Sequence, residues 1–393
     1  MDKYTEILKI ETIIFNKQHN NEDVNDFLDY YADVVDNYLN NKVDEHLDEI
    51  LSSLYNYQYL ENQKINNVIK KHQNLYQQNF NVLYDKLINK QEITQVESFK
   101  LRFLEEYLRA NPLGNNEMIT KLFNLYTINI LENKNKEYIS IDNYRNIIEL
   151  YIEQFKHLYN LDSVILSFTN DNQYIYGSHI SRRKYMVFEY IEINENLIND
   201  FYNNQSTKLF ETLIHEIEHL HQFCNIEKGM VSHDIINMIK DKILSDELDG
   251  YYENNYQNIS YEVDARVVGR KGMIDYFKAL GYKLNIQELE EKQNLNRIHN
   301  NKIDNLNNIF NVYIIDHPEL VKKYPQLLLE YEIKNNKVIR KSFQQMINDF
   351  EIIKKNNQMN ENDKQVYFDY YKQLLIDEYN NSYEQEFQNN KTI

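Results

Sequence analysis

The chain of 393 residues is poor in the residue types that interrupt or cross-link a polypeptide. It has one cysteine, three prolines, seven glycines and no tryptophan. The single cysteine, Cys224, excludes an internal disulfide and a zinc site built from cysteines. So few prolines and glycines exclude an all-β protein, which needs many turns, and also exclude long flexible linkers. Because six of the seven glycines lie between positions 177 and 281, we expect the tight turns there and helices on either side.

Basic residues are also few relative to acidic ones. Lys and Arg number 43 and Asp and Glu number 61, so the net charge is −18. A nucleic-acid-binding protein needs a cationic surface to release counterions from phosphates, and the sequence indicates none. The same charge disfavours anionic lipid headgroups. We therefore expect neither a nucleic-acid partner nor a membrane partner.

Long apolar runs are missing as well. No run approaches the length of about 18 apolar residues that indicates a transmembrane helix. The first residues, MDKYTEILKIETIIF, contain acidic side chains where a signal peptide has a long apolar segment. These absences predict a cytoplasmic protein. Hydrophobic residues make up 42% and charged residues 26% of the chain, which is an ordinary globular mixture with ample material for a buried core.

The hydrophobic pattern divides the chain into three parts. In residues 1–139, apolar positions recur near the helical period in segments such as 23–39 and 101–110, which predicts successive amphipathic helices. Residues 140–282 mix strand and helix signals, and residues 283–393 are again helical and acidic. We expect a central core between two helical regions, in an α+β fold that is mainly α.

The central part has a definite order of elements. Helical periodicity covers 140–161, 206–224, 231–250 and 260–280, with a Tyr- and Asn-rich loop at 251–258. Strand composition marks 163–170, 174–181 and 185–194. The last of these is the richest in β-branched and aromatic residues. We expect it to form the edge strand of a small mixed sheet beside the helix that follows it.

The helix predicted over 206–224 contains His215-Glu216-Ile217-Glu218-His219. Residues i and i+4 lie on one helix face, so both imidazoles can bind one metal ion. Glu216 lies about 100° round the helix, where its carboxylate can take a proton from a water polarised by that ion. Neutral imidazole is a good zinc ligand, and zinc lowers the pKa of its water to about 7. The spacing predicts a Zn²⁺ site with His215 and His219 as ligands and Glu216 as the general base.

A site with two histidines needs a third protein ligand, and the helix predicted from 260 offers one. Glu262 lies in its first turn, 43 residues after His219. Asp264 and Glu253 are the alternative third ligands. If Glu262 is the ligand, Asp264 is expected to accept a hydrogen bond from the free ring N–H of a ligand histidine.

Other polar residues near these segments could assist. A hydroxyl or imidazole donor can stabilise the oxyanion of a tetrahedral intermediate, and the candidates are His233, Tyr251, Tyr252, Tyr256 and Tyr261. Arg266 could pair with Glu262 or Asp264, or with a carboxylate of the substrate. Glu218 and His221 are expected on the solvated side of the motif helix.

The order of elements over about residues 140–282 resembles that of the zincin metallopeptidases, specifically the glutamate-ligand (gluzincin) group. In those families a backing helix, a small twisted sheet with an edge strand over the cleft, the HExxH helix and a later glutamate helix follow one another. His215, Glu216 and His219 match the first motif. Glu262 matches the ligand of the later helix, and Ala265 matches the alanine three residues beyond it.

The later motif departs from the thermolysin-like and CAAX-protease-like families. Those families have an Asp four residues after the ligand Glu, and this chain has Arg266. The combination of HExxH with Glu-x-x-Ala-Arg resembles uncharacterised proteins of bacteria and phages. In those proteins a Gln often follows the second His by three residues, as Gln222 does here.

The resemblance implies a zinc metallopeptidase that hydrolyses a peptide or protein substrate. Zinc would be held by His215, His219 and Glu262, with the substrate extended along 185–194. The alternative is a zincin-like protein that binds metal or peptide without cleaving it, with helical flanks that mediate interactions. An intact Glu216 favours the enzyme, because a pseudoenzyme needs no base. A helical scaffold with an accidental motif would leave the strand at 185–194 and Glu262 unexplained.

Overall fold

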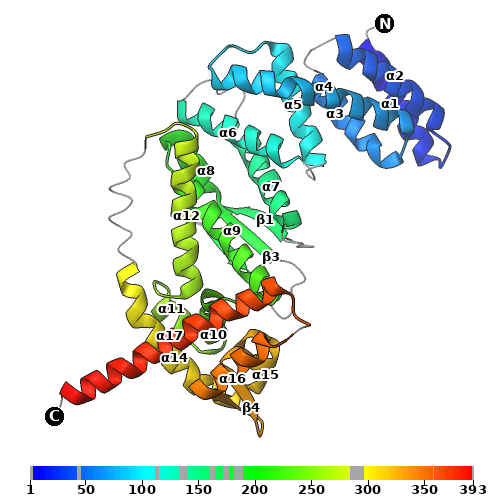
Figure 1. The fold of residues 1–393 in the computed structure, drawn as a ribbon. Helices are drawn as coiled ribbons and strands as arrows, with labels where there is room; N and C mark the ends of the chain where they lie inside the picture. The colour runs from blue at the N-terminus through cyan, green and yellow to red at the C-terminus, as the bar shows by residue number, and fades with distance from the viewer. Residues whose placement is uncertain are drawn as a thin grey trace. The chain divides into compact units, whose positions relative to one another are not determined.

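Helices predominate in the computed structural model of the chain (Figure 1). The structure describes residues 3–41, 46–110, 115–132, 140–158, 164–170, 177–180, 189–283, 296–356 and 358–391. Their strands form one three-stranded sheet and one two-stranded hairpin. The predicted α+β fold, mainly α, is confirmed at this level. None of the described helices combines the length and the apolar character needed to cross a bilayer.

The chain divides into two compact units. One consists of Met1–Leu166 with Glu195–Ser206, and the other of Ser167–Asn194 with Thr207–Ile393. We call them the first and the second unit. The predicted boundaries after 139 and after 282 adjoin segments outside the described residues, so the three-part organisation stays a prediction.

The first unit is helical. Its elements are α1 (Lys3–His19), α2 (Asn25–Asn41), α3 (Leu47–Asn56), the short η1 (Tyr57–Leu60), α4 (Gln63–Ile88), α5 (Gln95–Ala110), α6 (Asn116–Glu132), α7 (Ile141–Leu158) and α8 (Glu195–Asn204). The helices up to α7 confirm the succession predicted for the described parts of 1–161, whereas α8 was not predicted. The backbone N–H of Asn143 donates to the Ser140 hydroxyl over 3.0 Å, so Ser140 is the N-cap that begins α7.

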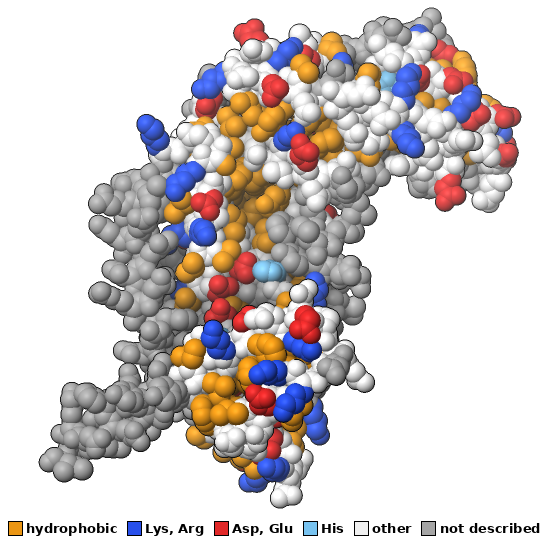
Figure 2. Space-filling view, viewed as in Figure 1, with side chains coloured by type: hydrophobic (Ala, Val, Ile, Leu, Met, Phe, Trp, Pro, Cys, Tyr) orange, Lys and Arg blue, Asp and Glu red, His pale blue; other side chains and the backbone are white. Residues whose placement is uncertain are grey.

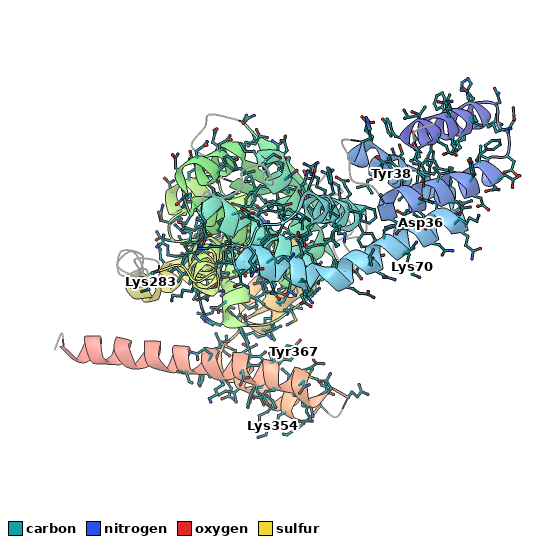
Figure 3. All side chains as sticks on the ribbon, turned by 90° about the horizontal axis from the view of Figure 1, so that it is seen from above. Asp36, Tyr38, Lys70, Lys283, Lys354 and Tyr367 are labelled. Carbon is teal, nitrogen blue, oxygen red and sulfur yellow. The ribbon has the colours of Figure 1, made fainter. Side chains whose placement is uncertain are left out.

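Polar contacts accompany the apolar packing between helices of the first unit. Asp36 on α2 (Figure 3) accepts hydrogen bonds from Lys71 Nζ and His72 Nε2 of α4, with one distance of 2.7 Å to each. His72 is fully buried. Burial lowers the pKa of His72 although the Asp36 carboxylate acts in the opposite direction. This contact therefore fixes α2 against α4 at a definite position along both helices.

The three-stranded sheet consists of β1 (Val164–Thr169), β2 (Gly177–Ile180) and β3 (Glu189–Asn194), in the order β1-β3-β2. β2 and β3 are antiparallel, with Gly177 opposite Ile193. The prediction that 185–194 forms the edge strand is wrong, because β3 lies in the middle and β2 lies at the edge. Residues 181–188 are outside the described part. Composition could not separate the two positions: Ile191 and Ile193 are fully buried on one face of β3, and a strand with one buried face has the same apolar pattern at an edge as in the middle of a sheet.

Four helices of the second unit surround the motif. They are α9 (Lys208–Glu227), α10 (His233–Glu247), the short α11 (Tyr251–Asn255) and α12 (Ser260–Ala279). Three match the predicted helices, whereas α11 occupies part of the predicted loop at 251–258. Ser232 caps α10 through a 3.1 Å bond from the Ile235 backbone N–H. Gly281, with φ of +83°, ends the segment after α12 in the left-handed conformation that glycine tolerates.

Small residues on α12 allow it to lie directly against α9 (Figure 1). A Cβ built on Gly269 would come within 2.7 Å of the Glu211 carbonyl oxygen, and one on Gly272 within 3.1 Å of the Ile214 side chain. Ala265, one turn before Gly269, is fully buried. Because these positions lack bulk, the two helix backbones approach closely, which brings the first turn of α12 to the motif on α9.

The C-terminal part of the second unit is a helical layer with one hairpin. It comprises α14 (Asn296–Tyr313), η4 (Ile314–Asp316), α15 (Pro318–Lys323), η5 (Pro325–Leu329), β4 (Tyr331–Lys334), β5 (Lys337–Arg340), α16 (Phe343–Lys354) and α17 (Glu361–Lys391). The purely helical expectation for 283–393 is wrong at the hairpin. Asn335 and Asn336 both adopt positive φ, of 49° and 60°, which suits the two-residue turn of an antiparallel hairpin.

A buried ion pair joins this layer to α10. Lys240 Nζ donates to Glu330 Oε2 over 2.7 Å and to Asn307 Oδ1 over 2.9 Å. The Tyr370 hydroxyl donates to the other Glu330 oxygen over 2.7 Å. Lys240 and Glu330 are 1% and 2% exposed. Burial alone would raise the pKa of Glu330, but the Lys240 charge and these hydrogen bonds lower it, so the carboxylate stays ionised.

Candidate metal centre

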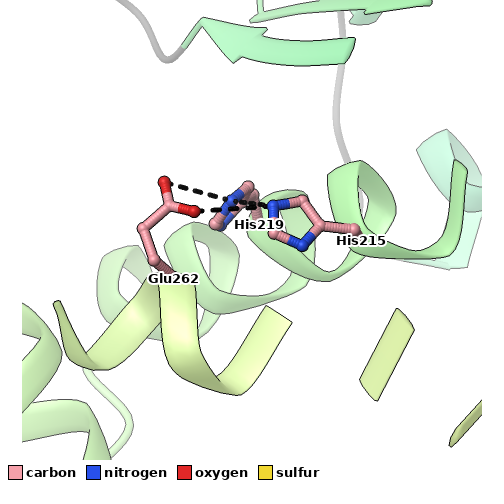
Figure 4. A group of neighbouring side chains, drawn as sticks. All are labelled: His215, His219 and Glu262. Carbon is pink, nitrogen blue, oxygen red and sulfur yellow. Dashed lines mark hydrogen bonds and ion pairs between the residues drawn. The ribbon is translucent and has the colours of Figure 1, made fainter. Parts of the chain in front are cut away.

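Three side chains from two helices converge on one point (Figure 4). His215 and His219 lie on successive turns of α9, and Glu262 lies in the first turn of α12. The two Nε2 atoms are 3.1 Å apart. Glu262 Oε2 is 3.5 Å from His215 Nε2, and Glu262 Oε1 is 3.6 Å from His219 Nε2. The group could hold a metal ion, since one ligand atom from each residue lies within 4.8 Å of the others.

The spacing and chemistry of these atoms fit a tetrahedral ion. With ligand distances of about 2.0–2.1 Å, two ligands of a tetrahedral zinc site are about 3.3 Å apart. The distance between the two Nε2 atoms and the distance from each of them to its nearer Glu262 oxygen are close to this value. Glu262 is 5% exposed. Its Oε2 lies 3.5 Å from His215 Nε2, and within the described residues no hydrogen bond of good geometry reaches it. A buried carboxylate oxygen without a donor is costly, and a cation between the three residues would remove that cost.

The two histidines and Glu262 determine one another's protonation states. Burial would raise the pKa of Glu262, but hydrogen bonding and charge from His215 and His219 outweigh it and hold that pKa far below the ordinary range. Burial would lower the pKa of His219, but Glu262 reverses the effect and the pKa is raised. Without a metal the site therefore favours a proton on an imidazole beside an ionised carboxylate, and a divalent cation would replace that proton.

Glu216 is buried beside the edge strand. It is 5% exposed, and its Cγ would be 3.2 Å from a Cβ placed on Gly177, the first residue of β2. The same Cβ would be 2.8 Å from Thr212 Cγ2. Glycine at 177 therefore leaves room for the Glu216 side chain between α9 and the sheet. The role of Glu216 as a base stays a prediction.

The partner of the second ring nitrogen of His219 is Gln222, where the sequence led us to expect Asp264. Gln222 lies between His219 and Asp264: His219 Nδ1 is 3.0 Å from Gln222 Oε1, and Gln222 Nε2 donates to Asp264 Oδ2 over 2.8 Å. The Gln222 amide also donates to the Tyr261 carbonyl over 3.0 Å. Asp264 is also outside the group of three that could hold a metal, which the structure forms with Glu262.

Two tyrosines of the segment before α12 lie next to the site. The Tyr252 hydroxyl donates to Glu262 Oε1 over 3.0 Å. Burial, followed by the Glu262 charge, raises the pKa of Tyr252. Burial and the Glu262 and Glu216 charges raise the pKa of Tyr256 to about 12, against a smaller opposite effect of Arg266. Both phenols therefore stay protonated and can donate hydrogen bonds at the site.

Arg266 has a structural role in this segment. Its Nε donates to the Glu262 carbonyl over 3.0 Å, and its other nitrogens donate to Gln257 Oε1 over 2.6 Å and to the Tyr256 carbonyl over 3.1 Å. The guanidinium lies over the Tyr256 ring, 5.3 Å from the centroid. These contacts differ from the predicted pairing with a carboxylate of Glu262 or Asp264, and they fix the segment that carries Tyr256.

His233 and His221 lie outside the group of three that the described residues form. His233 Nδ1 is 3.4 Å from Asn237 Nδ2 on α10. His221 Nδ1 is 3.1 Å from Glu218 Oε1, and its Nε2 accepts from Asn225 over 2.9 Å. On the face seen in Figure 2, a histidine side chain reaches the surface beside acidic side chains. His215 is the most exposed ligand, at 14% of its side chain.

Asp241 on α10 supports the site, and it was absent from the sequence-based prediction. Its Oδ2 accepts the Ser260 backbone N–H over 2.8 Å, so it caps the N-terminus of α12, and its Oδ1 accepts the Tyr251 hydroxyl over 2.7 Å. The N-cap residue of α12 itself is Ile259, whose side chain has no oxygen that could accept a hydrogen bond from the first turn. The sequence signal for such a contact is a predicted helix whose N-cap residue has an apolar side chain, because the cap must then come from another part of the chain.

Comparison of the chain with known proteins adds no relative to this geometry. No family model matches the sequence, no curated protein matches it, and no solved structure matches the fold. The feature of the chain that points to a function is therefore the convergence of His215, His219 and Glu262.

Proposed function

We propose that the protein is a zinc-dependent hydrolase of peptide bonds. The observation that carries the proposal is the convergence of His215, His219 and Glu262 around a point that a metal ion would fit, with Glu216 buried on the same helix. Zinc held there would polarise the scissile carbonyl and lower the pKa of a water molecule.

The proposed roles of the other side chains follow from their places. The Glu216 carboxylate takes the proton of the attacking water and then passes it to the leaving amine. Both phenols are protonated at neutral pH, and Tyr256 can donate a hydrogen bond to the oxyanion that develops; Tyr252 can do so only if its hydroxyl turns away from Glu262. Arg266 orients the backbone that carries Tyr256.

The substrate is proposed to lie along β2, since β3 is central. β2 is an edge of the described sheet, so one row of its backbone groups is not used by β3. An extended peptide can add to such an edge through main-chain hydrogen bonds. Because Gly177 of β2 lies directly over Glu216, a peptide on this edge would pass next to the proposed base.

The test compares Glu216→Gln with His215→Ala and with the matched change Glu218→Gln on the same helix. We expect Glu216→Gln to retain zinc and to lose hydrolysis of a peptide mixture by about 10²–10⁴-fold, which is typical for removal of a general base. His215→Ala should lose both zinc and activity. Glu218→Gln should keep both, because Glu218 faces His221.

Two results would overturn the proposal. If Glu216→Gln hydrolyses peptides like the wild type, Glu216 is not the base. If wild-type protein binds zinc and cleaves no member of the mixture, the metal serves recognition or stability, as in the non-cleaving alternative.

A further inference from the structure

Gln222 stands between the two helices that carry the proposed ligands. It lies one turn after His219 on α9 and is 3% exposed. One end of its amide faces His219 Nδ1 at 3.0 Å. The other end faces two acceptors on α12, the Tyr261 carbonyl at 3.0 Å and Asp264 Oδ2 at 2.8 Å. Tyr261 and Asp264 lie on either side of Glu262 in the sequence.

The chemistry of these neighbours fixes the direction of the amide. A backbone carbonyl can only accept hydrogen bonds, and so can an ionised carboxylate. The amide NH₂ of Gln222 must therefore face Tyr261 and Asp264, which uses both of its hydrogens. The Gln222 oxygen is then left facing His219, where it can only accept.

The direction of the amide in turn fixes the tautomer of His219. Because Gln222 presents an oxygen, the neutral imidazole places its hydrogen on Nδ1. The lone pair of His219 is then on Nε2, the atom that lies 3.1 Å from His215 Nε2 and 3.6 Å from Glu262 Oε1. In the opposite tautomer, a hydrogen on Nε2 would occupy the place of the metal.

We propose that Gln222 is the positioning residue of the metal centre, and that Asp264 acts on His219 through Gln222. The inference rests on the proposed metal centre and adds to it a residue that sets the ligand tautomer. The same amide joins α9 to the backbone on either side of Glu262, so it orients one ligand and also holds the helix of another. The charged group is one hydrogen bond removed from the imidazole, and a neutral amide is its direct partner.

The experiment measures zinc affinity of the full chain by competition with a chromophoric chelator. Gln222→Met keeps the length of the side chain and removes both hydrogen-bonding groups. We expect its zinc affinity to fall about 10–100-fold, as is typical when a hydrogen-bond partner of a metal ligand is lost. Gln326→Met is the matched control. Gln326 is 5% exposed and donates to the Ile226 carbonyl over 2.7 Å, away from the proposed ligands. The zinc affinity of the Gln326→Met variant should therefore stay at the wild-type value.

Asp264 provides a second pair of variants. Asp264→Asn keeps an oxygen that can accept from the Gln222 amide, so we expect zinc affinity close to wild type. Asp264→Ala removes the acceptor, and its zinc affinity should fall, though by less than for Gln222→Met because the Tyr261 carbonyl still holds one amide hydrogen. Asp264 is half-buried, so these changes are milder for folding than those at Gln222.

A spectroscopic measurement separates positioning from simple support of the fold. Nitrogen NMR of isotope-labelled histidine, recorded on zinc-free protein at a pH where the rings are neutral, reports which nitrogen carries the hydrogen. His219 should carry it on Nδ1 in the wild type and should become a mixture of tautomers in Gln222→Met. Gln326→Met should leave the His219 spectrum unchanged.

Several outcomes would overturn the inference. The first is a zinc affinity of Gln222→Met equal to that of the wild type. The second is an equal loss of zinc affinity in Gln222→Met and Gln326→Met. The third is a His219 ring that carries its hydrogen on Nε2 in the wild type. Equal losses in Asp264→Asn and Asp264→Ala would show that the charge is needed and would refute the acceptor role. These outcomes can be told apart from a failure of the proposed function. If the wild type binds no zinc, the proposed metal centre is wrong, and the tautomer measurement on the zinc-free protein still tests the role of Gln222.

Discussion

Gly269→Ala tests whether close packing of α9 and α12 builds the metal centre. The added methyl carbon would lie 2.7 Å from the Glu211 carbonyl oxygen, 3.2 Å from His215 Cβ and 3.3 Å from the His215 backbone nitrogen. Ordinary contact begins at 3.4 Å, so the helices must separate locally by about 0.7 Å. Two of the three opposing atoms belong to the backbone, which cannot turn aside as a flexible side chain can.

The magnitude follows from two opposing effects. Alanine favours a helix over glycine by about 1 kcal/mol, whereas overpacking a filled interface costs about 1–3 kcal/mol. Gly272→Ala on the same helix has the same gain in helix propensity, but its methyl group would meet only the Ile214 side chain, at 3.1 Å. We expect Gly269→Ala to be less stable to urea than Gly272→Ala by about 1–3 kcal/mol.

Zinc affinity should follow the same order. Metal sites tolerate changes of about 0.2 Å in ligand distance, and the required separation of the helices occurs at His215 itself. Chelator competition should therefore show weaker zinc binding in Gly269→Ala than in Gly272→Ala. If Gly269→Ala proves as stable as Gly272→Ala and binds zinc equally well, the close approach of the two helices does not position the ligands.

Three further predictions concern charges and hydrogen bonds of the second unit. Glu330→Gln should lower the free energy of unfolding by about 3–5 kcal/mol, because it leaves Lys240 buried without its counter-charge; urea unfolding measures this, and a loss below 1 kcal/mol would contradict it. The lowered pKa of Glu330 means that its stabilisation is complete at neutral pH and disappears as the pH falls below the ordinary carboxyl value of about 4, so wild type and Glu330→Gln should converge in acid. The raised pKa of His219 means that protons compete for the metal site from above the ordinary histidine value of about 6.5, so a titration should show zinc affinity declining already near neutral pH; an onset well below pH 6 would refute this. Tyr252→Phe removes the hydrogen bond to Glu262, and calorimetry should show zinc bound at unchanged stoichiometry. The pH dependence of binding should shift upward, because a Glu262 carboxylate without this donor raises the pKa of His219 further.

Local sequence patterns predicted the parts of the site that depend on one helix. The spacing of His215 and His219 follows from helix geometry, and Glu262 could be placed in a first turn because the helical period begins near 260. The three side chains meet because Gly269 and Gly272 have no side chains, which allows α12 to approach α9 closely. The spacing of residues along one helix gives no information about the distance between two helices.

The errors of prediction concern contacts between elements. Strand composition predicted a strand over 185–194, which contains β3, but could not tell a central strand from an edge strand, since pairing is not local. Asp264 had the right chemistry for a partner of His219, but Gln222 is the residue that reaches the ring. The Asn335-Asn336 turn was visible only as an interruption, because two asparagines with positive φ are a weaker signal than Asn-Gly.

The buried pair of Lys240 and Glu330 bears on how the protein can be dissected. Deleting everything after residue 282 would remove Glu330, Asn307 and Tyr370 together, and would leave a lysine ammonium inside an apolar cluster that also loses Phe310. Such a truncated chain would fail to fold for a reason unrelated to what the C-terminal helices do. The function of the C-terminal helices should therefore be studied by substitutions on their exposed faces. A deletion would show only the effect of disrupting the apolar cluster around α10.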